Sequence, residues 1–158
     1  MPDTGGDIVV RAFQPGDEAA FRDINLDWIG RFFVVEAKDR ETLDNPVTKI
    51  LDPGGEILLA CDGAEAIGCV ALMVMGQGEF ELAKMGVRPQ AQGRGVGRKL
   101  MQAAVDTARA RGARRLYLET NSKLGPALKL YADAGFVNVQ GPPSPYARAD
   151  VQMELWLT

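Results

Sequence analysis

A glycine-rich run between a predicted strand and a predicted helix constrains this chain more than any other feature. Residues 92–97 read Gln-Gly-Arg-Gly-Val-Gly, and closely spaced glycines let a backbone turn tightly and approach a ligand. Apolar residues then recur at helical spacing, at positions 96, 100, 104 and 108. The first N–H groups of a helix lack intrahelical partners, and the helix dipole favours an anion there. Because Arg94, Arg98 and Lys99 add positive charge, the run predicts a pyrophosphate-binding cradle.

Two familiar phosphate-binding loops do not match this run. A P-loop ends in Gly-Lys-Ser/Thr, which this run lacks. The dinucleotide fingerprint G-x-G-x-x-G has a different spacing, since the glycines here fall at 93, 95 and 97. A tight turn that binds no ligand is the other alternative. Three glycines flanked by three basic residues at the start of a helix favour the cradle.

The rest of the chain alternates short apolar segments with helical patterns. Pro89 ends one strand, because proline cannot continue a central strand. The order of elements predicts an α+β fold with one central sheet, in which residues 79–120 can form a right-handed strand–helix–strand unit. A length of 158 residues predicts a single domain over 1–158. We predict strands over 7–13, 56–61, 67–75, 79–87, 115–120, 136–139 and 151–157, and helices around 20–29, 37–44, 96–108 and 126–134.

The composition excludes several kinds of chemistry. The chain contains no histidine, which removes Ser-His-Asp triads, imidazole bases and histidine metal ligands. Cys61 and Cys69 make no zinc site and are expected as buried thiols, so no metal is predicted. No apolar run approaches the ~18 residues of a membrane helix, and residues 1–7 do not resemble a signal peptide. We therefore expect a cytoplasmic protein without a membrane partner.

Charge is distributed unevenly along the chain. Residues 1–83 carry 16 acids and 6 bases, a net charge of −10, whereas residues 84–158 carry 5 acids and 12 bases, a net charge of +7. Such asymmetry indicates a polyanionic partner for the second half: a phosphorylated cofactor, a nucleic acid or an acidic domain. No nucleic-acid-binding module is recognisable, and the arginines are spread over helix faces and ends. We therefore do not expect a nucleic acid as a partner.

Two motifs lie in the predicted cradle and in the last predicted helix. The cradle contains Gln92-x-x-Gly95-x-Gly97, and residues 127–136 read ALKLYADAGF. They match the Q/R-x-x-G-x-G/A and A-x-x-L-Y-x-x-x-G-F patterns of the GNAT superfamily, the acyl-CoA-dependent N-acetyltransferases, and the chain resembles stand-alone bacterial members. The predicted element order fits that family from Ile8 to Leu157. The resemblance implies a mixed sheet of about six to seven strands with about four flanking helices, splayed between strands four and five.

The resemblance also implies acetyl-CoA as the acyl-donor co-substrate. Backbone groups at the end of the fourth strand would bind the pantetheine arm, and the cradle would bind the pyrophosphate. Many relatives carry an asparagine seven residues before the helix tyrosine, where this chain has Leu124. Asn121 lies nearby, so it either contacts the cofactor or caps the next helix. The other implied cofactor-binding residues are Met85, Gly86, Val87, Gln92, Gly93, Arg94, Gly95, Val96, Gly97 and Arg98.

The candidate catalytic residues are a tyrosine and three glutamates. Tyr131 matches the family tyrosine that protonates or hydrogen-bonds the leaving thiolate, and a phenol of pKa ~10 suits a thiolate of pKa ~8.5. Core packing is its alternative role. Glu81 lies where many relatives place an acid facing the acceptor, and Glu119 matches the base of some N-terminal acetyltransferases. Glu79, on the same strand face as Glu81, is a third candidate. For each glutamate, the alternatives are a solvated carboxylate and a reaction without a dedicated base.

The implied function is transfer of an acetyl group from acetyl-CoA to a primary amine by direct attack. Trp28, Phe32 and Phe33, with acids nearby, suit a small molecule, an amino acid or a peptide or protein N-terminus as the acceptor. Tyr146 and Arg148 follow a proline-rich loop and either line the acceptor pocket or belong to a rigid surface loop. A non-catalytic acyl-CoA-binding or sensing module is the alternative function. Dimers are common in the family, so a homodimer is left open.

Overall fold

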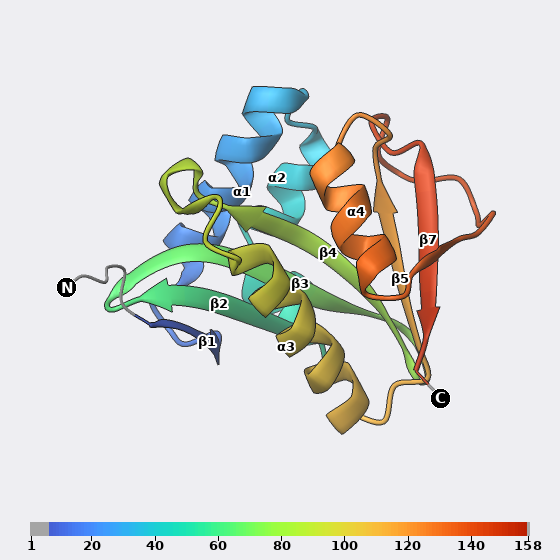
Figure 1. The fold of residues 1–158 in the computed structure, drawn as a ribbon, viewed down its shortest axis with the longest axis horizontal. Coiled ribbons are helices and arrows are strands. Elements are labelled where there is room, and N and C mark those ends of the chain that lie inside the picture. The colour runs from blue at the N-terminus through green and yellow to red at the C-terminus, as the bar shows by residue number, and fades with distance from the viewer. Residues whose placement is uncertain (1–6, 158) are drawn as a thin grey trace.

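A computed structural model describes residues 7–157 as an open sheet with helices packed on both faces (Figure 1). The strands are β1 (Ile8–Ala12), β2 (Glu56–Asp62), β3 (Glu65–Gly76), β4 (Glu79–Val87), β5 (Arg115–Thr120), β6 (Val137–Asn138) and β7 (Val151–Trp156). The helices are α1 (Glu18–Phe32), α2 (Ala37–Leu43), α3 (Val96–Ala110) and α4 (Gly125–Asp133), with a π-helical turn η1 (Val47–Leu51) and a 3-10 turn η2 (Pro89–Ala91). This architecture confirms the predicted α+β class and its element order.

The sheet is splayed between its two central strands. The strand order is β1-β2-β3-β4-β5-β7-β6, and β4–β5 is the parallel pair among otherwise antiparallel neighbours. β4 and β5 pair only through residues 79–81 and 115–117 and then separate, which confirms the predicted splay (Figure 1). Residues 82–87 therefore have no β5 partner. An unpaired strand edge presents N–H and C=O groups to a ligand.

Alternation along β2 divides the core between the two faces of the sheet. Leu58 packs in the cluster that contains α3, whereas Ile57 packs in the cluster that contains α1. The predicted α3 stripe is buried, with Leu100 fully covered. Cys61 and Cys69 are free and buried, as predicted. The core thus holds α1 and α3 against opposite faces of β2–β4, and this fixes where the splay opens.

β4 contains a β-bulge that strand alternation alone did not predict. Ala71 of β3 pairs with Ala83 and Cys69 pairs with Gly86, so β4 has one more residue than β3 over this interval. Lys84 lies in the bulge with a φ of 56°, a left-handed conformation that is uncommon for a lysine. Bulges re-aim side chains and increase local twist. This bulge follows the last residue of β4 that pairs with β5.

Three segments differ in detail from the sequence-based expectation. The turn η1 extends helical structure beyond Pro46, which fits because proline is tolerated at a helix start. The strand expected over 136–139 is limited to the two residues of β6, since Phe136 turns into the core instead. α4 begins at Gly125 with Leu124 as its N-cap. The prediction that Asn121 caps this helix is therefore wrong.

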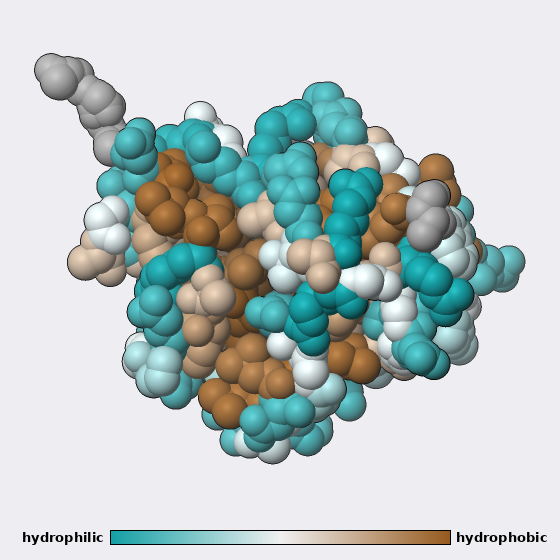
Figure 2. Space-filling view, turned by 90° about the horizontal axis from the view of Figure 1, so that it is seen from below, coloured by the Kyte–Doolittle hydropathy of each residue, from teal (hydrophilic) through white to brown (hydrophobic). Residues whose placement is uncertain are grey.

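The face shown in Figure 2 carries apolar patches between hydrophilic side chains. Exposed apolar residues include Val74, Met75 and Trp156. No helix within residues 7–157 combines the length and the apolar character that a membrane crossing needs. The prediction about a signal peptide concerned residues 1–7, of which 1–6 lie outside the described part of the chain.

Candidate active site

A cleft with a volume of about 630 Å³ opens where β4 and β5 separate. Its walls are residues 81–87 of β4, the turn 91–98 without Arg94, the end of β5, α4 and part of the loop before β7. The end of α1 contributes three aromatic side chains, Trp28, Phe32 and Phe33. We call this cavity the β4–β5 cleft. It brings together most of the residues that the two sequence motifs singled out.

The glycine-rich run forms the turn that leads into α3. Gly93 and Gly95 have φ values of 85° and 76°, and the space that a Cβ would occupy is open at both positions. Gly95 is the N-cap of α3 and no side chain caps this end, so the first helix N–H groups can serve an external acceptor. Gln92, Val96 and Gly97 also line the cleft. This wall of the cleft therefore has the geometry of an anion-binding helix start.

The three basic residues of this turn do not all face the cleft. Arg94 forms an ion pair with Asp62 at 3.1 Å and is not among the residues that line the cleft. Arg98 does line it and pairs with Asp133 at 2.8 Å, while Lys99 does not line it. The geometry therefore favours backbone N–H groups and Arg98 as the anion-binding groups, in place of a cluster of three cations.

The free edge of β4 forms the opposite wall. Met85, Gly86 and Val87 all line the cleft. A Cβ at Gly86 would lie 2.6 Å from Cδ1 of Trp28 and 3.0 Å from Cγ2 of Ile24, so glycine allows α1 to pack closely against this strand. Close packing therefore explains the glycine at this position, and the neighbouring backbone edge, which has no β5 partner, lies next to an aromatic wall.

Glu81 is the last residue of β4 that pairs with β5, and it lines the cleft. Burial is the main cause that raises its pKa, the charge of Glu119 adds to this, and Lys84 acts in the opposite direction, so that the pKa is about 7. A carboxyl with a pKa near neutral exchanges protons at physiological pH, as a general base must.

The other two candidate glutamates are held by polar partners. Glu119 lines the cleft and accepts hydrogen bonds from the hydroxyls of Tyr117 at 2.9 Å and Ser144 at 2.6 Å. Glu79 forms an ion pair with Arg115 at 3.1 Å and is not among the residues that line the cleft. These contacts make both carboxylates weaker candidates for the base.

Tyr131 reaches the cleft from α4. Its residue is 9% exposed, its ring meets Phe136 edge-on at a centroid distance of 6.1 Å, and it lines the cleft. Burial raises the pKa of the phenol to about 12, so the hydroxyl keeps its proton at neutral pH. It is therefore placed as a proton or hydrogen-bond donor at the cleft wall.

Asn121 also lines the cleft, although both polar atoms of its side chain form hydrogen bonds within the chain. Its Nδ2 donates to the carbonyl of Arg148 at 2.6 Å, and its Oδ1 accepts the N–H of Lys123 at 2.8 Å. The side chain thus ties the end of β5 to the loop before β7. This contact supports a role in shaping the cleft wall over direct hydrogen bonding to a cofactor.

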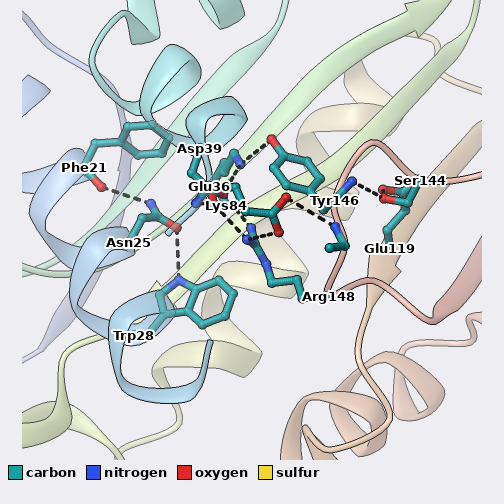
Figure 3. A network of polar contacts seen from close by, with 11 residues as sticks. Phe21, Asn25, Trp28, Glu36, Asp39, Lys84, Glu119, Ser144, Tyr146 and Arg148 are labelled. Carbon is teal, nitrogen blue, oxygen red and sulfur yellow. Dashed lines mark hydrogen bonds and ion pairs between the residues drawn. The ribbon is translucent and has the colours of Figure 1, made fainter. Parts of the chain in front are cut away.

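A buried network of charged groups connects α2, the β4 bulge and the loop before β7 (Figure 3). Asp39 is fully buried and accepts two hydrogen bonds from Arg148, at 2.5 and 2.8 Å, and one from the backbone N–H of Glu36 at 2.8 Å. Nζ of Lys84 lies 3.4 Å from Asp39 and donates to the hydroxyl of Tyr146 at 2.9 Å. The network fastens the loop across one end of the cleft.

Sequence reasoning left two roles open for Tyr146 and Arg148 and missed Asp39 and Lys84. Both Tyr146 and Arg148 line the cleft. Asp39 lies in an otherwise polar helix and Lys84 alternates normally within its strand, so neither gave a signal. A fully buried aspartate can be found only when its cationic partners, 45 and 109 positions away, are known to be adjacent.

We expect Asp39→Ala to destabilise the fold by about 3–5 kcal/mol, because removing one partner of a buried ion pair leaves uncompensated charge. Burial alone would raise the pKa of Asp39, but its hydrogen bonds and the charges of Lys84 and Arg148 outweigh this and lower it. The ionised form therefore contributes stability near neutral pH, which is lost as the pH falls through that lowered pKa. Urea unfolding at pH 7.5 measures the change.

Glu41→Ala is the matched control for Asp39→Ala. Glu41 lies on the same helix but forms an exposed ion pair with Lys49, and exposed pairs contribute ~1 kcal/mol or less. A loss for Asp39→Ala no larger than the loss for Glu41→Ala would contradict the structural importance of the network.

A second prediction concerns the effect of Glu81 on the pH dependence of folding stability. Its raised pKa means that the folded state holds a proton which the unfolded state releases near pH 4.5. Folding stability therefore falls as the pH rises from that value to about 7. We expect Glu81→Gln to be more stable than wild type at pH 8, by roughly 1–3 kcal/mol, and equally stable at pH 4.5. Thermal unfolding at the two pH values checks this, and an equal effect at both would contradict the pKa assignment.

Sequence comparison places the chain among known acetyltransferases. The sequence model of the Acetyltransferase (GNAT) family matches residues 12–136. An IAA acetyltransferase from Azospirillum brasilense is 35% identical over 95 residues, covering 60% of this chain and 61% of the relative. A mycothiol acetyltransferase from Cellulomonas flavigena is 32% identical over 158 residues, covering 86% of this chain and 44% of the relative. The chain therefore spans between about two fifths and three fifths of the length of these relatives.

Comparison with solved structures shows that the chain has the fold of known acetyltransferases. A GNAT-family acetyltransferase from Staphylococcus aureus superposes with a TM-score of 0.87 at 19% identity, covering 96% of this chain and 100% of that one. The yncA protein of Salmonella typhimurium, whose structure includes its cofactor acetyl-CoA, gives a TM-score of 0.74 at 20% identity, covering 97% and 95%. The family match extends over most of the chain and includes both motifs and the splayed strands. The chain belongs to the acetyltransferase (GNAT) family.

Proposed function

We propose that this protein transfers an acetyl group from acetyl-CoA to a primary amine. The observation that carries the proposal is the position of Glu81, a carboxyl with a pKa of about 7, in a cleft that also holds a helix N-terminus and a free strand edge. This combination provides a base, an anion site and a backbone surface for an extended ligand. A binding module without turnover would not require the base.

The residues of the cleft fit an acyl-CoA molecule. The N–H groups at the start of α3, together with Arg98, suit the pyrophosphate, because the turn at Gly93 and Gly95 leaves open space beside them. The free edge of β4 at residues 85–87 suits the pantetheine arm, whose amides can pair with it as a neighbouring strand would. When bound, the co-substrate supplies the activated acetyl group as a thioester. The protein supplies position, and proximity alone can contribute about 7–11 kcal/mol to a reaction barrier.

The chemistry follows from the groups that face the cleft. The amine nitrogen forms a bond to the acetyl carbon as the carbon–sulfur bond breaks. Glu81 accepts the proton that the amine loses, and the hydroxyl of Tyr131 donates a proton to the departing sulfur. The raised pKa of Tyr131, about 12, keeps this proton in place until the sulfur develops charge. No step requires histidine, which the chain does not contain.

The proposal is tested by calorimetry with acetyl-CoA and by a thiol-release assay over a panel of primary amines. We expect micromolar binding of acetyl-CoA, thiol release that depends on the amine, and an N-acetylated product by mass spectrometry. Binding without turnover on any amine would support the acyl-CoA-binding module instead. Failure to bind any acyl-CoA at micromolar concentration would contradict both functions.

A further inference from the structure

We propose that the acceptor carries a carboxylate beside its primary amine, as an apolar α-amino acid does, and that Lys84 and Arg148 bind this carboxylate. The proposal rests on the proposed function and adds the substrate class. Both cations line the β4–β5 cleft, as the proposed base Glu81 does, whereas their acidic partners Asp39 and Glu36 do not line it. The cleft wall therefore presents cations whose counter-ions lie behind them.

The hydrogen bonding of this wall leaves donors for a ligand. Lys84 has three N–H groups, and within residues 7–157 its contacts use two of them, one to Asp39 and one to Tyr146. Arg148 donates from Nη1 and Nη2, and among the same residues its Nε–H has no partner. A carboxylate accepts from both kinds of donor, and charge-assisted hydrogen bonds are the stronger ones.

The charge of the buried part of the network also favours an anion. Asp39 is fully buried and is shared by two cations, Lys84 with a 6% exposed side chain and Arg148 with 14%. These three groups carry one excess positive charge. Glu36 offsets it only from outside, at 3.4 Å from Arg148 and with a 26% exposed side chain. A substrate carboxylate in the cleft would neutralise this excess positive charge from the cleft side.

The geometry holds these cations in place before a ligand arrives. Lys84 keeps a left-handed backbone in the β4 bulge, and such conformations persist where the surrounding structure fixes them, often at functional sites. Both cations lie against the ring of Tyr146, each 4.6 Å from its centroid (Figure 3). Trp28 provides an apolar wall of the cleft. Glu81, which lies on β4 as Lys84 does, would face the amine. The cleft thus has separate positions for an amine, a carboxylate and an apolar side chain.

The test compares matched acceptors. Each of L-leucine, L-methionine and L-phenylalanine is assayed beside its decarboxylated amine and its amide, and kcat/KM is measured for wild type and Lys84→Met. We expect wild type to prefer at least one amino acid over both of its partners by tenfold or more, and Lys84→Met to reduce this preference at least tenfold. Because the amine pKa differs among acceptors, the wild-type-to-variant ratio of kcat/KM is also compared for each acceptor.

Lys49→Met is the matched control, since it removes one exposed lysine that does not line the cleft, and we expect its preferences to equal those of wild type. The wild-type panel needs no variant, so the proposal stays testable even if Lys84→Met does not fold. Equal or better turnover of every decarboxylated amine by wild type would overturn the carboxylate site and leave the acetyltransferase function standing. Absence of turnover on all amines would instead count against the proposed function itself.

Discussion

Replacing Gly95 with glutamate is expected to weaken acetyl-CoA binding at least a hundredfold, which corresponds to about 2.7 kcal/mol. Two causes act together. The residue has a φ of 76°, so any side chain other than that of glycine strains the backbone turn that aims the α3 N–H groups. The added carboxylate also lies at the helix N-terminus, where it competes with the pyrophosphate for the same N–H groups and repels it. Isothermal titration calorimetry measures the change.

The control for Gly95→Glu is Gly112→Glu. Gly112 has nearly the same φ, 75°, and equally open space for a Cβ, but it follows the C-terminal end of α3 and does not line the cleft. The two variants share the strain and the added charge, so they differ only in distance from the cradle. We expect Gly112→Glu to bind acetyl-CoA as wild type does. Equal affinities of the two variants would mean that the α3 N-terminus does not bind the cofactor.

Local sequence patterns predicted most of the helices and strands. The apolar stripe of α3 is read directly from residues 96, 100, 104 and 108, because a helix that covers one sheet face needs apolar side chains at that spacing. The splay followed from the family resemblance. The bulge at Lys84 could not be read, because the residues around it alternate as in a regular strand. Its side chain contacts Asp39 and Tyr146, which are distant in the sequence.

The candidate site likewise contains residues that sequence motifs indicate and residues that only the structure reveals. The cradle and Tyr131 lie in contiguous motifs, so the residue pattern singled out the cradle and the family resemblance singled out Tyr131. The choice among the glutamates needed structure, because the difference between Glu81 and Glu119 lies in burial and in hydrogen bonds from Tyr117 and Ser144. The buried network of charged groups joins α2, β4 and the loop before β7, and no local pattern links segments so far apart. Sequence therefore singled out residues within contiguous motifs more readily than contacts between distant segments.

Glu81→Gln is expected to lower kcat by about 10²–10⁴-fold, the usual contribution of a positioned general base, with little effect on acetyl-CoA affinity. Glutamine keeps the size and polarity of the side chain but cannot accept the proton of the amine. In wild type, the carboxyl must be ionised to act, so kcat should rise with pH and level off above the Glu81 pKa of about 7. In Glu81→Gln this rise should be absent. Stopped-flow thiol release across pH 5.5–9 measures both effects.

Two further glutamate variants separate the base from its neighbours. Glu79→Gln removes a carboxylate from the same strand face two residues earlier, where it pairs with Arg115 outside the cleft, and kcat should change less than threefold. Glu119→Gln removes a charge that helps to raise the pKa of Glu81, so the midpoint of the pH profile should move to lower pH while most activity remains. A large loss of kcat in Glu119→Gln together with an active Glu81→Gln would reassign the base to Glu119. The direction of the shift in the pH profile therefore distinguishes the general base from a neighbouring residue that only changes the pKa of that base.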